Sequence, residues 1–309
     1  MRILLVGCSG FVGRALVPLL LEAGHSLTLV SRAARPLPAL EHPQLQRLQA
    51  DPSRATSWQQ PALQQALAAA EAVVNLAGEP IAEKRWTPQH QQLLTSSRID
   101  TTRALVAAMA ALPEAQRPQV LLNGSAIGYY GTSTTERFVE SSPAGGDFLG
   151  GLCAAWEAEA RAAESFCRVV ILRIGIVLGA DGGALGKMLP VFRLGFGGPI
   201  GDGQQWMSWI ARPDLCQLIA TALTDPAYSG VYNAVAPEPC RMAAFSAALG
   251  RCLSRPSLLP VPGPMLQLLL GDGAKVVLEG QQVLPQRLLE QGFTFRQGEL
   301  SAALAAATS

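Results

Sequence analysis

The sequence has few of the residues from which metal and disulfide sites are built. Its six cysteines are dispersed over 309 residues and include no C-x-x-C pair, so neither a disulfide framework nor a zinc site is expected. It has only three histidines and no H-E-x-x-H motif, which leaves little support for a catalytic metal. We therefore predict a site that contains no metal.

The chain also lacks long hydrophobic runs and an excess of charge of one sign. No apolar run approaches the ~18 residues of a membrane span, and no N-terminal hydrophobic segment is followed by a cleavage site. The formal net charge is +1 and there is no basic cluster, so electrostatics give no reason to expect nucleic acid or an anionic membrane as a partner. We predict a cytoplasmic protein with no membrane span.

What the sequence does contain is a strand, a glycine turn and a helix at its start. The apolar run 2–6 leads into Gly7, Gly10 and Gly13, and an apolar-periodic segment follows to Ala23. Gly7 suits a tight turn, Gly10 lets the backbone approach a pyrophosphate, and Gly13 lets helix and strand pack closely. The helix N-terminus then offers free N–H groups to phosphate. The pattern predicts a dinucleotide site formed by Gly7, Gly10, Phe11, Val12 and Gly13.

The residues after the second predicted strand, 25–30, distinguish between the two nicotinamide dinucleotides. An NAD site places a carboxylate here to hold the ribose hydroxyls, but the sequence has no acid at this point. A hydroxyl and two guanidinium groups suit a 2′-phosphate, which arginine binds with two hydrogen bonds. Ser31, Arg32 and Arg35 therefore favour NADP(H) over NAD(H), with ordinary solvated loop charges as the alternative.

Apolar and β-branched runs alternate with helical patterns as far as residue 178, which predicts an α/β fold with a Rossmann-like doubly wound parallel sheet. Beyond that point, Gly- and Pro-rich segments separate shorter helices. We predict an NADP(H)-binding domain over 1–178, completed by about 205–233, and a smaller C-terminal α/β lobe over 179–204 and 234–309. Further strands are expected at 45–49, 72–76, 119–122 and 168–174, with helices at 61–70, 88–112 and 149–166.

The turn after the predicted strand 72–76 resembles that of the short-chain dehydrogenase/reductase superfamily. The sequence there is Asn75-Leu76-Ala77-Gly78, and in extended members of the superfamily this turn lies against the cofactor. The resemblance implies backbone contacts from Leu76, Ala77 and Gly78. Further matching segments follow in order at 173–179, 209–215 and 230–233.

Longer segments resemble a narrower branch of that superfamily, the nucleoside-diphosphate-sugar epimerase-like proteins with a distinctive C-terminal domain. They lie at 125–131, 197–201, 205–210, 280–289 and 292–293. The resemblance implies NADPH as ligand with Arg98 and Val177 near it, and a helix-surface charge is the alternative for Arg98. Some members of this branch carry a cell-division inhibitor label, which makes a division-related regulatory role conceivable.

The residues for proton transfer depart from the superfamily pattern. Short-chain dehydrogenases use a tyrosine as acid/base, beside a serine or threonine, and a lysine four residues on makes the phenolate accessible. Here Cys153 aligns with the tyrosine, Glu157 with the lysine and Ala126 with the serine, while Ser125 lies one residue early. The site is predicted to be degenerate and no catalytic residue can be named. Candidate substitutes are Ser125, Tyr129, Tyr130 and Cys153, with packed aromatics as the alternative for the tyrosines.

The glycine-rich segment 181–190 is a candidate flap over the nicotinamide. Small-molecule pockets pair apolar walls with a few polar groups, and loop packing with a solvated Lys187 is the alternative. The residues predicted to contact a substrate are Tyr129, Tyr130, Lys187, Gln205 and Trp209.

Two functions from different classes remain open on the sequence. The first is an NADP(H)-dependent oxidoreductase-like or epimerase-like enzyme with a non-standard active site, acting on a small carbonyl or sugar-derived substrate. The second is a non-catalytic NADPH-binding regulatory protein that signals to a protein partner. The missing tyrosine and lysine favour the second function, and the intact cofactor half is compatible with both.

Overall fold

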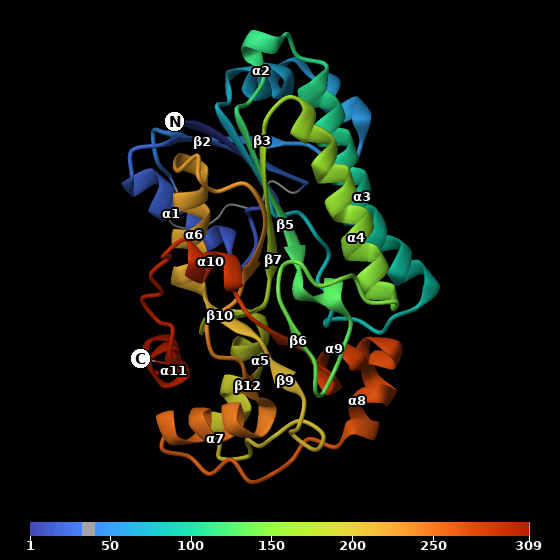
Figure 1. Ribbon diagram of the computed structural model, residues 1–309, viewed down its shortest axis with the longest axis vertical. Coiled ribbons are helices and arrows are strands. Elements are labelled where there is room, and N and C mark those ends of the chain that lie inside the picture. The colour runs from blue at the N-terminus through green and yellow to red at the C-terminus, as the bar shows by residue number, and fades with distance from the viewer. Residues whose placement is uncertain (33–40, 309) are drawn as a thin grey trace.

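A computed structural model describes residues 1–32 and 41–308 as an α/β protein organised around one large sheet (Figure 1). Its seven strands lie in the order β11-β7-β5-β4-β1-β2-β3, and every neighbouring pair is parallel. The predicted Rossmann-like sheet is therefore confirmed. The strands are β1 (Arg2–Val6), β2 (Ser26–Ser31), β3 (Leu45–Gln49), β4 (Ala72–Asn75), β5 (Val120–Ala126), β7 (Arg168–Ile174) and β11 (Gly230–Ala234).

Helices cover both faces of the sheet, which gives the doubly wound arrangement. On one face, the apolar stripes of α1 (Gly13–Glu22) and α6 (Arg212–Thr224) pack on the strands. On the other, α2 (Pro61–Ala69), α3 (Pro88–Ala110) and α4 (Phe148–Arg161) do the same. Burial of these stripes removes apolar surface from water at about 25 cal/mol per Å² and is the main stabilising contribution.

Two predicted elements differ from the observed ones by more than two residues. The strand expected over 119–122 continues to Ala126, because Asn123 and Ser125 are buried with hydrogen-bonded side chains although they end the apolar run. The helix expected over 149–166 ends at Arg161 and continues as the 3₁₀ turn η4 (Ala162–Ser165). The longer β5 extends the carboxyl edge of the sheet, where ligands of open α/β sheets bind.

Apart from α6 and β11, which belong to the large sheet and its cover, most segments after β7 build a smaller lobe with its own core. Trp209 and Phe245 are fully buried there, together with leucines from three helices. Figure 1 shows this lobe at the lower end of the view. Its elements are β8 (Ile176–Leu178), α5 (Gly183–Arg193), β9 (Trp206–Met207), β10 (Trp209–Ala211), β12 (Cys240–Arg241), α7 (Met242–Cys252), α8 (Gly263–Leu270), α9 (Lys275–Leu278) and α11 (Leu300–Thr308).

The C-terminal part of the chain returns to the sheet. The short strand β13 (Gln282–Val283) pairs in parallel with β6 (Arg137–Phe138), which lies in the loop after β5. The helix α10 (Gln286–Glu290) follows and contacts β11. The lobe and the carboxyl edge of the sheet are thus joined by main-chain pairing.

Within residues 1–32 and 41–308, no helix has the length and apolarity needed to cross a bilayer. The same residues contain no cluster of three or more histidine, cysteine or acidic side chains arranged to hold a metal ion.

Candidate functional site

The glycine turn between β1 and α1 is tightly packed at Gly7 and Gly13 and has open space at Gly10. A Cβ atom at Gly7, where φ is +75°, would lie 2.3 Å from the nitrogen of Ala77, and one at Gly13 would lie 1.9 Å from the oxygen of Cys8. A Cβ at Gly10 would meet only the Gly7 oxygen, at 3.8 Å. Gly7 and Gly13 are therefore required by packing, whereas Gly10 leaves space beside the N-terminus of α1. This shape fits the pyrophosphate of a dinucleotide.

The turn after β4 lies directly against the glycine turn. The Leu76 N–H donates to the Val6 carbonyl over 2.9 Å, and the Ala77 N–H donates to the Asn75 Oδ1 over 3.2 Å. Asn75 is fully buried, and its Nδ2 donates to Asn123 Oδ1 over 2.7 Å. This amide pair fixes the turn at the point where the strand order reverses, the usual ligand crevice of such sheets.

Arg98 extends from α3 to the same turn. A Cβ at Gly78 would lie 3.0 Å from the Arg98 Cζ, and Arg98 donates to the Glu79 carbonyl over 2.9 Å. Burial lowers the pKa of this guanidinium, although the nearby Cys153 and Glu79 act in the opposite direction. The structure thus brings Leu76, Ala77, Gly78 and Arg98 together beside the glycine turn, and their contact with a cofactor stays a prediction.

The residues predicted to bind a 2′-phosphate lie at the carboxyl end of β2. Ser31 is the last residue of that strand, and β2 pairs with β1 beside the glycine turn. Arg32 is exposed, with its backbone oxygen accepting a hydrogen bond from Gln49 over 3.3 Å. Arg35 lies outside the described residues. An exposed guanidinium at this edge suits a phosphate group on the adenosine ribose.

The predicted flap 181–190 begins against the Phe11 ring of the glycine turn, and its residues from Gly183 on belong to α5. Its position over a nicotinamide stays a prediction. Val177 belongs to β8, and the following residues 179–183 cover the Phe11 ring. A Cβ at Gly182 would lie 2.6 Å from that ring, so the close approach requires glycine. Lys187 is exposed on α5, and its Nζ donates to the Ala82 carbonyl over 3.3 Å. This bond joins the lobe to the loop that follows β4.

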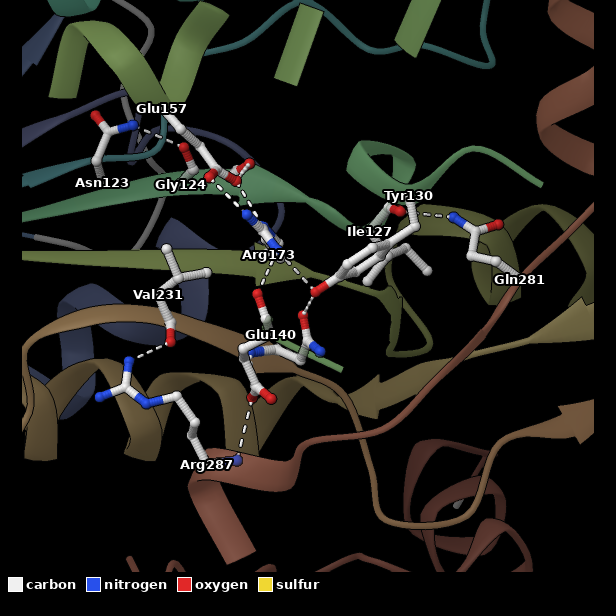
Figure 2. A network of polar contacts seen from close by, with 12 residues as sticks. Asn123, Gly124, Ile127, Tyr130, Glu140, Glu157, Arg173, Val231, Gln281 and Arg287 are labelled. Carbon is white, nitrogen blue, oxygen red and sulfur yellow. Dashed lines mark hydrogen bonds and ion pairs between the residues drawn. The ribbon is translucent and has the colours of Figure 1, made fainter. Parts of the chain in front are cut away.

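At the edge of the sheet beyond β4, a buried ion pair occupies the position expected for proton transfer (Figure 2). Arg173 donates from Nε to Glu157 Oε1 over 2.8 Å and from Nη2 to Oε2 over 2.9 Å. The two side chains are only 3% and 4% exposed. Ser125 Oγ also donates to Glu157 Oε1, over 2.8 Å. Both carboxylate oxygens of Glu157 are thus hydrogen-bonded to side chains of the protein.

The two neighbouring tyrosines of η3 (Ile127–Tyr130) have different environments. The Tyr130 hydroxyl donates to Asn233 Oδ1 over 2.6 Å and accepts from Arg173 Nη1 over 2.9 Å. Burial is the main reason that the pKa of Tyr130 is raised to about 12. Tyr129 is only half-buried, with its ring centroid 3.3 Å from the Arg173 Cζ. Of the two phenols, Tyr129 is the one that remains accessible.

Cys153 is held as a neutral thiol. The pKa of Cys153 is raised to about 11, chiefly by burial; the guanidinium of Arg98 opposes this shift and the carboxylate of Glu157 contributes to it. The thiolate is the reactive form of cysteine. Cys153 therefore has neither a nucleophilic nor a basic form available at neutral pH.

Three of the residues predicted to contact a substrate are buried. Trp209 is 0% exposed and its Nε1 donates to the Glu238 carbonyl. Gln205 donates to the carbonyls of Ile200 and Val277 from inside the lobe, and Tyr130 belongs to the network described above. Because these side chains are packed within the protein, we retain only Tyr129 and Lys187 as proposed substrate contacts.

Sequence reasoning missed Arg173, on which the polar network is centred. The signal was present, because Arg173 is a charged residue directly after the apolar run 169–172 of β7. A charge buried in such a strand needs an ionic partner. The position of Glu157 among alanines on α4 did not identify it as that partner.

Comparison with known proteins matches almost the whole chain. The profile of the NAD dependent epimerase/dehydratase family covers residues 3–235, and a domain of unknown function (DUF1731) covers residues 261–307. The Arabidopsis thaliana epimerase family protein SDR39U1 homolog, chloroplastic, is 44% identical over 99% of this chain and 86% of its own. Bacillus subtilis epimerase family protein YfhF is 34% identical over 98% of this chain and 97% of its own.

A solved structure shows the same fold. The crystal structure of human epimerase family protein SDR39U1 (isoform2) with NADPH is 37% identical, with a TM-score of 0.86 over 99% of both chains. The names of these relatives do not refer to cell division, so they lend no support to a division-related role. The cytoplasmic location also stays a prediction. From the sequence profile and the relatives together, the chain belongs to the NAD dependent epimerase/dehydratase family, in the SDR39U1-like branch that carries a C-terminal DUF1731 region.

Proposed function

We propose that the protein binds NADPH along the crevice formed by the glycine turn and the turn after β4. The open side of Gly10, between two glycines that packing requires, is the observation on which this proposal depends. Arg32 at the end of β2 is proposed to bind the 2′-phosphate. The human relative crystallised with NADPH supports the choice of dinucleotide. When bound, the nicotinamide supplies hydride chemistry.

We further propose an oxidoreductase-like or epimerase-like reaction on a small carbonyl or sugar-derived substrate. Tyr129 supports this, since it presents an accessible phenol at the sheet edge. Its hydroxyl makes no hydrogen bond to another described residue, so a substrate can accept from it. General acid–base assistance is worth a factor of about 10² to 10⁴, and slow turnover is expected without the usual tyrosine and lysine.

The alternative is a regulatory protein that binds NADPH without turnover. It is favoured by the polar network, because Ser125, Glu157 and Arg173 satisfy one another and Tyr130 is buried among them. Within the described part of the chain, these four groups bond to one another, to Asn233 and to the Glu140 carbonyl. A change in the lobe on NADPH binding would then be the signal to a partner.

The experiment that tests NADPH binding is a titration with NADPH and NADH, followed by nicotinamide fluorescence. We expect a clear NADPH preference that Arg32→Ala lowers by a factor of about 10 to 150, since a charged phosphate contact is worth about 1.5–3 kcal/mol. Arg161→Ala, which removes another exposed arginine far along the chain, is the matched control. Equal affinity for NADPH and NADH in the unmodified protein would rule out the assignment of Arg32.

A panel of carbonyl compounds then separates the two functions. Consumption of NADPH with any of them supports the enzyme. Tight NADPH binding without turnover on the whole panel favours the regulatory protein.

A further inference from the structure

Two arginines flank the glycine turn, and a single carboxylate binds both. Arg212 Nη1 lies 2.6 Å from Asp181 Oδ1. Arg14 Nη2 lies 3.6 Å from Asp181 Oδ2 and donates to the Asp181 carbonyl over 3.0 Å. Arg14 is the second residue of α1 and Arg212 the first residue of α6, so two helix N-termini direct cations to one point.

Arg212 is fixed against the backbone of the turn itself. Its Nη1 donates to the Phe11 carbonyl over 3.4 Å, and its Cζ lies 4.6 Å from the centroid of the Phe11 ring. Phe11 directly follows Gly10, the residue with the open side. The Arg212 side chain is 20% exposed, so it is partly desolvated and still open to a ligand at the turn.

We propose that Arg212 and Arg14 bind the pyrophosphate of the dinucleotide, and that Asp181 is the anion that pairs with them when no dinucleotide is present. This inference rests on the proposed binding of NADPH. The Asp181 side chain is 51% exposed, and ion pairs exposed to this degree contribute little net stability. A pyrophosphate offers more oxygen acceptors than a carboxylate, and arginine binds phosphate oxygens in matched geometry. Exchange of Asp181 for pyrophosphate is therefore favourable.

The residues 179–183 connect this exchange to the lobe. They cover Phe11 through glycines, and Asp181 is the charged residue among them. Release of Asp181 removes the ion pairs that tie this segment to the two arginines and leaves its packing on Phe11 as the remaining contact with the glycine turn. The segment is thereby coupled to occupation of the pyrophosphate site.

The affinities for NADPH and NADH distinguish the role of Arg14 and Arg212 from that of Arg32. NADPH and NADH share the pyrophosphate and differ in the 2′-phosphate. We expect Arg212→Gln to weaken both nucleotides by the same factor, about tenfold for the loss of one charged hydrogen-bonding group. Arg14→Gln should also weaken the binding of both nucleotides, by a smaller factor, because the Arg14 side chain is 45% exposed. Asp181→Asn removes the competing anion and tightens the binding of both nucleotides.

The test measures dissociation constants for NADPH and NADH by nicotinamide fluorescence in these variants, with Arg161→Gln as an exposed arginine control and thermal unfolding as a check of folding. Arg212→Lys is included because it keeps the charge, and partial recovery of affinity supports the proposal. Unchanged affinity in folded Arg212→Gln overturns the proposal, as does a loss confined to NADPH. Weaker binding in Asp181→Asn overturns the role given to Asp181. If the unmodified protein binds neither nucleotide, the proposed function itself fails.

Discussion

The Arg173 guanidinium binds both carboxylate oxygens of Glu157 in the protein interior and so joins β7 to α4. Ser125 and Tyr130 are hydrogen-bonded to the same pair. Four side chains from β5, η3, α4 and β7 thus form one polar unit at the carboxyl edge of the sheet. Their mutual hydrogen bonds give them a structural role in the region where the superfamily resemblance predicts proton-transfer residues.

Removal of one partner of this ion pair is expected to be costly. Glu157→Gln leaves Arg173 with an uncompensated buried charge, and breaking buried pairs in this way costs about 3–5 kcal/mol. The measurement is the free energy of unfolding from urea titrations. Glu164→Gln is the control, because it breaks an exposed pair with Arg161 that is worth about 0–1 kcal/mol. Equal effects of the two substitutions would contradict the structural role of Glu157.

Gly10→Ala is expected to separate folding from binding. The methyl group meets no atom closer than 3.8 Å, so thermal unfolding should change little, whereas the methyl occupies the space proposed for pyrophosphate and should abolish NADPH binding. Gly151→Ala adds a methyl in open space on α4 and should stabilise the helix by about 1 kcal/mol with binding intact. A Gly10→Ala protein that binds NADPH normally would show that the pyrophosphate lies elsewhere.

The two tyrosines should respond differently to loss of the hydroxyl. Tyr130→Phe removes the hydrogen bonds of the hydroxyl to Asn233 Oδ1 and Arg173 Nη1, and the buried Asn233 oxygen loses its donor, at a cost of about 1–3 kcal/mol in the free energy of unfolding. Tyr129→Phe should leave that free energy unchanged and lower any turnover. The same urea titrations and an NADPH oxidation assay check both statements. Turnover unaffected by Tyr129→Phe would exclude this phenol as the proton donor.

The buried thiols predict a loss of stability in alkaline solution. Burial raises the pKa of Cys8 to about 12 and that of Cys153 to about 11, against 9.0 for the free thiol. The unfolded chain therefore releases these protons first, so their contribution is complete below pH 9 and is lost as the pH rises through the folded values. Each such group lowers the free energy of unfolding by at most about 1.4 kcal/mol per pH unit in this range.

The measurement is the urea midpoint of the protein between about pH 8 and about pH 10. Cys153→Ala removes one of the titrating groups and should show a shallower decline over this interval. An identical decline in the variant would mean that Cys153 ionises equally in the folded and unfolded states.

The sheet and its glycine turn could be predicted because their signals are local. Gly7, Gly10 and Gly13 follow an apolar strand directly, and the period of the apolar residues changes there from strand to helix. The continuation of β5 through Asn123 could not be predicted in this way. Its polar residues are accommodated because Asn75 lies beside Asn123 on the neighbouring strand and Glu157 accepts from Ser125, and both partners are distant in the sequence.

The site itself was partly predictable for the same reason. The backbone turn at Leu76–Gly78 was identified from a contiguous motif. The pairing of Arg173 with Glu157, and of Asp181 with two arginines, depends on which elements the fold brings together. Charged residues on separate elements carry no local sign of their partners.

The contacts of the C-terminal region with the sheet edge constrain how the two regions can diverge within the family. Gln281 donates to the Ile127 carbonyl over 2.9 Å, and Asn233 donates to the Leu284 carbonyl over 2.9 Å. The turn that carries Tyr129 is thus shaped by residues that belong to the C-terminal region. A chimaera that exchanges this region between two relatives would alter the geometry at the sheet edge, so the two regions are expected to have diverged in step rather than to have been recombined freely.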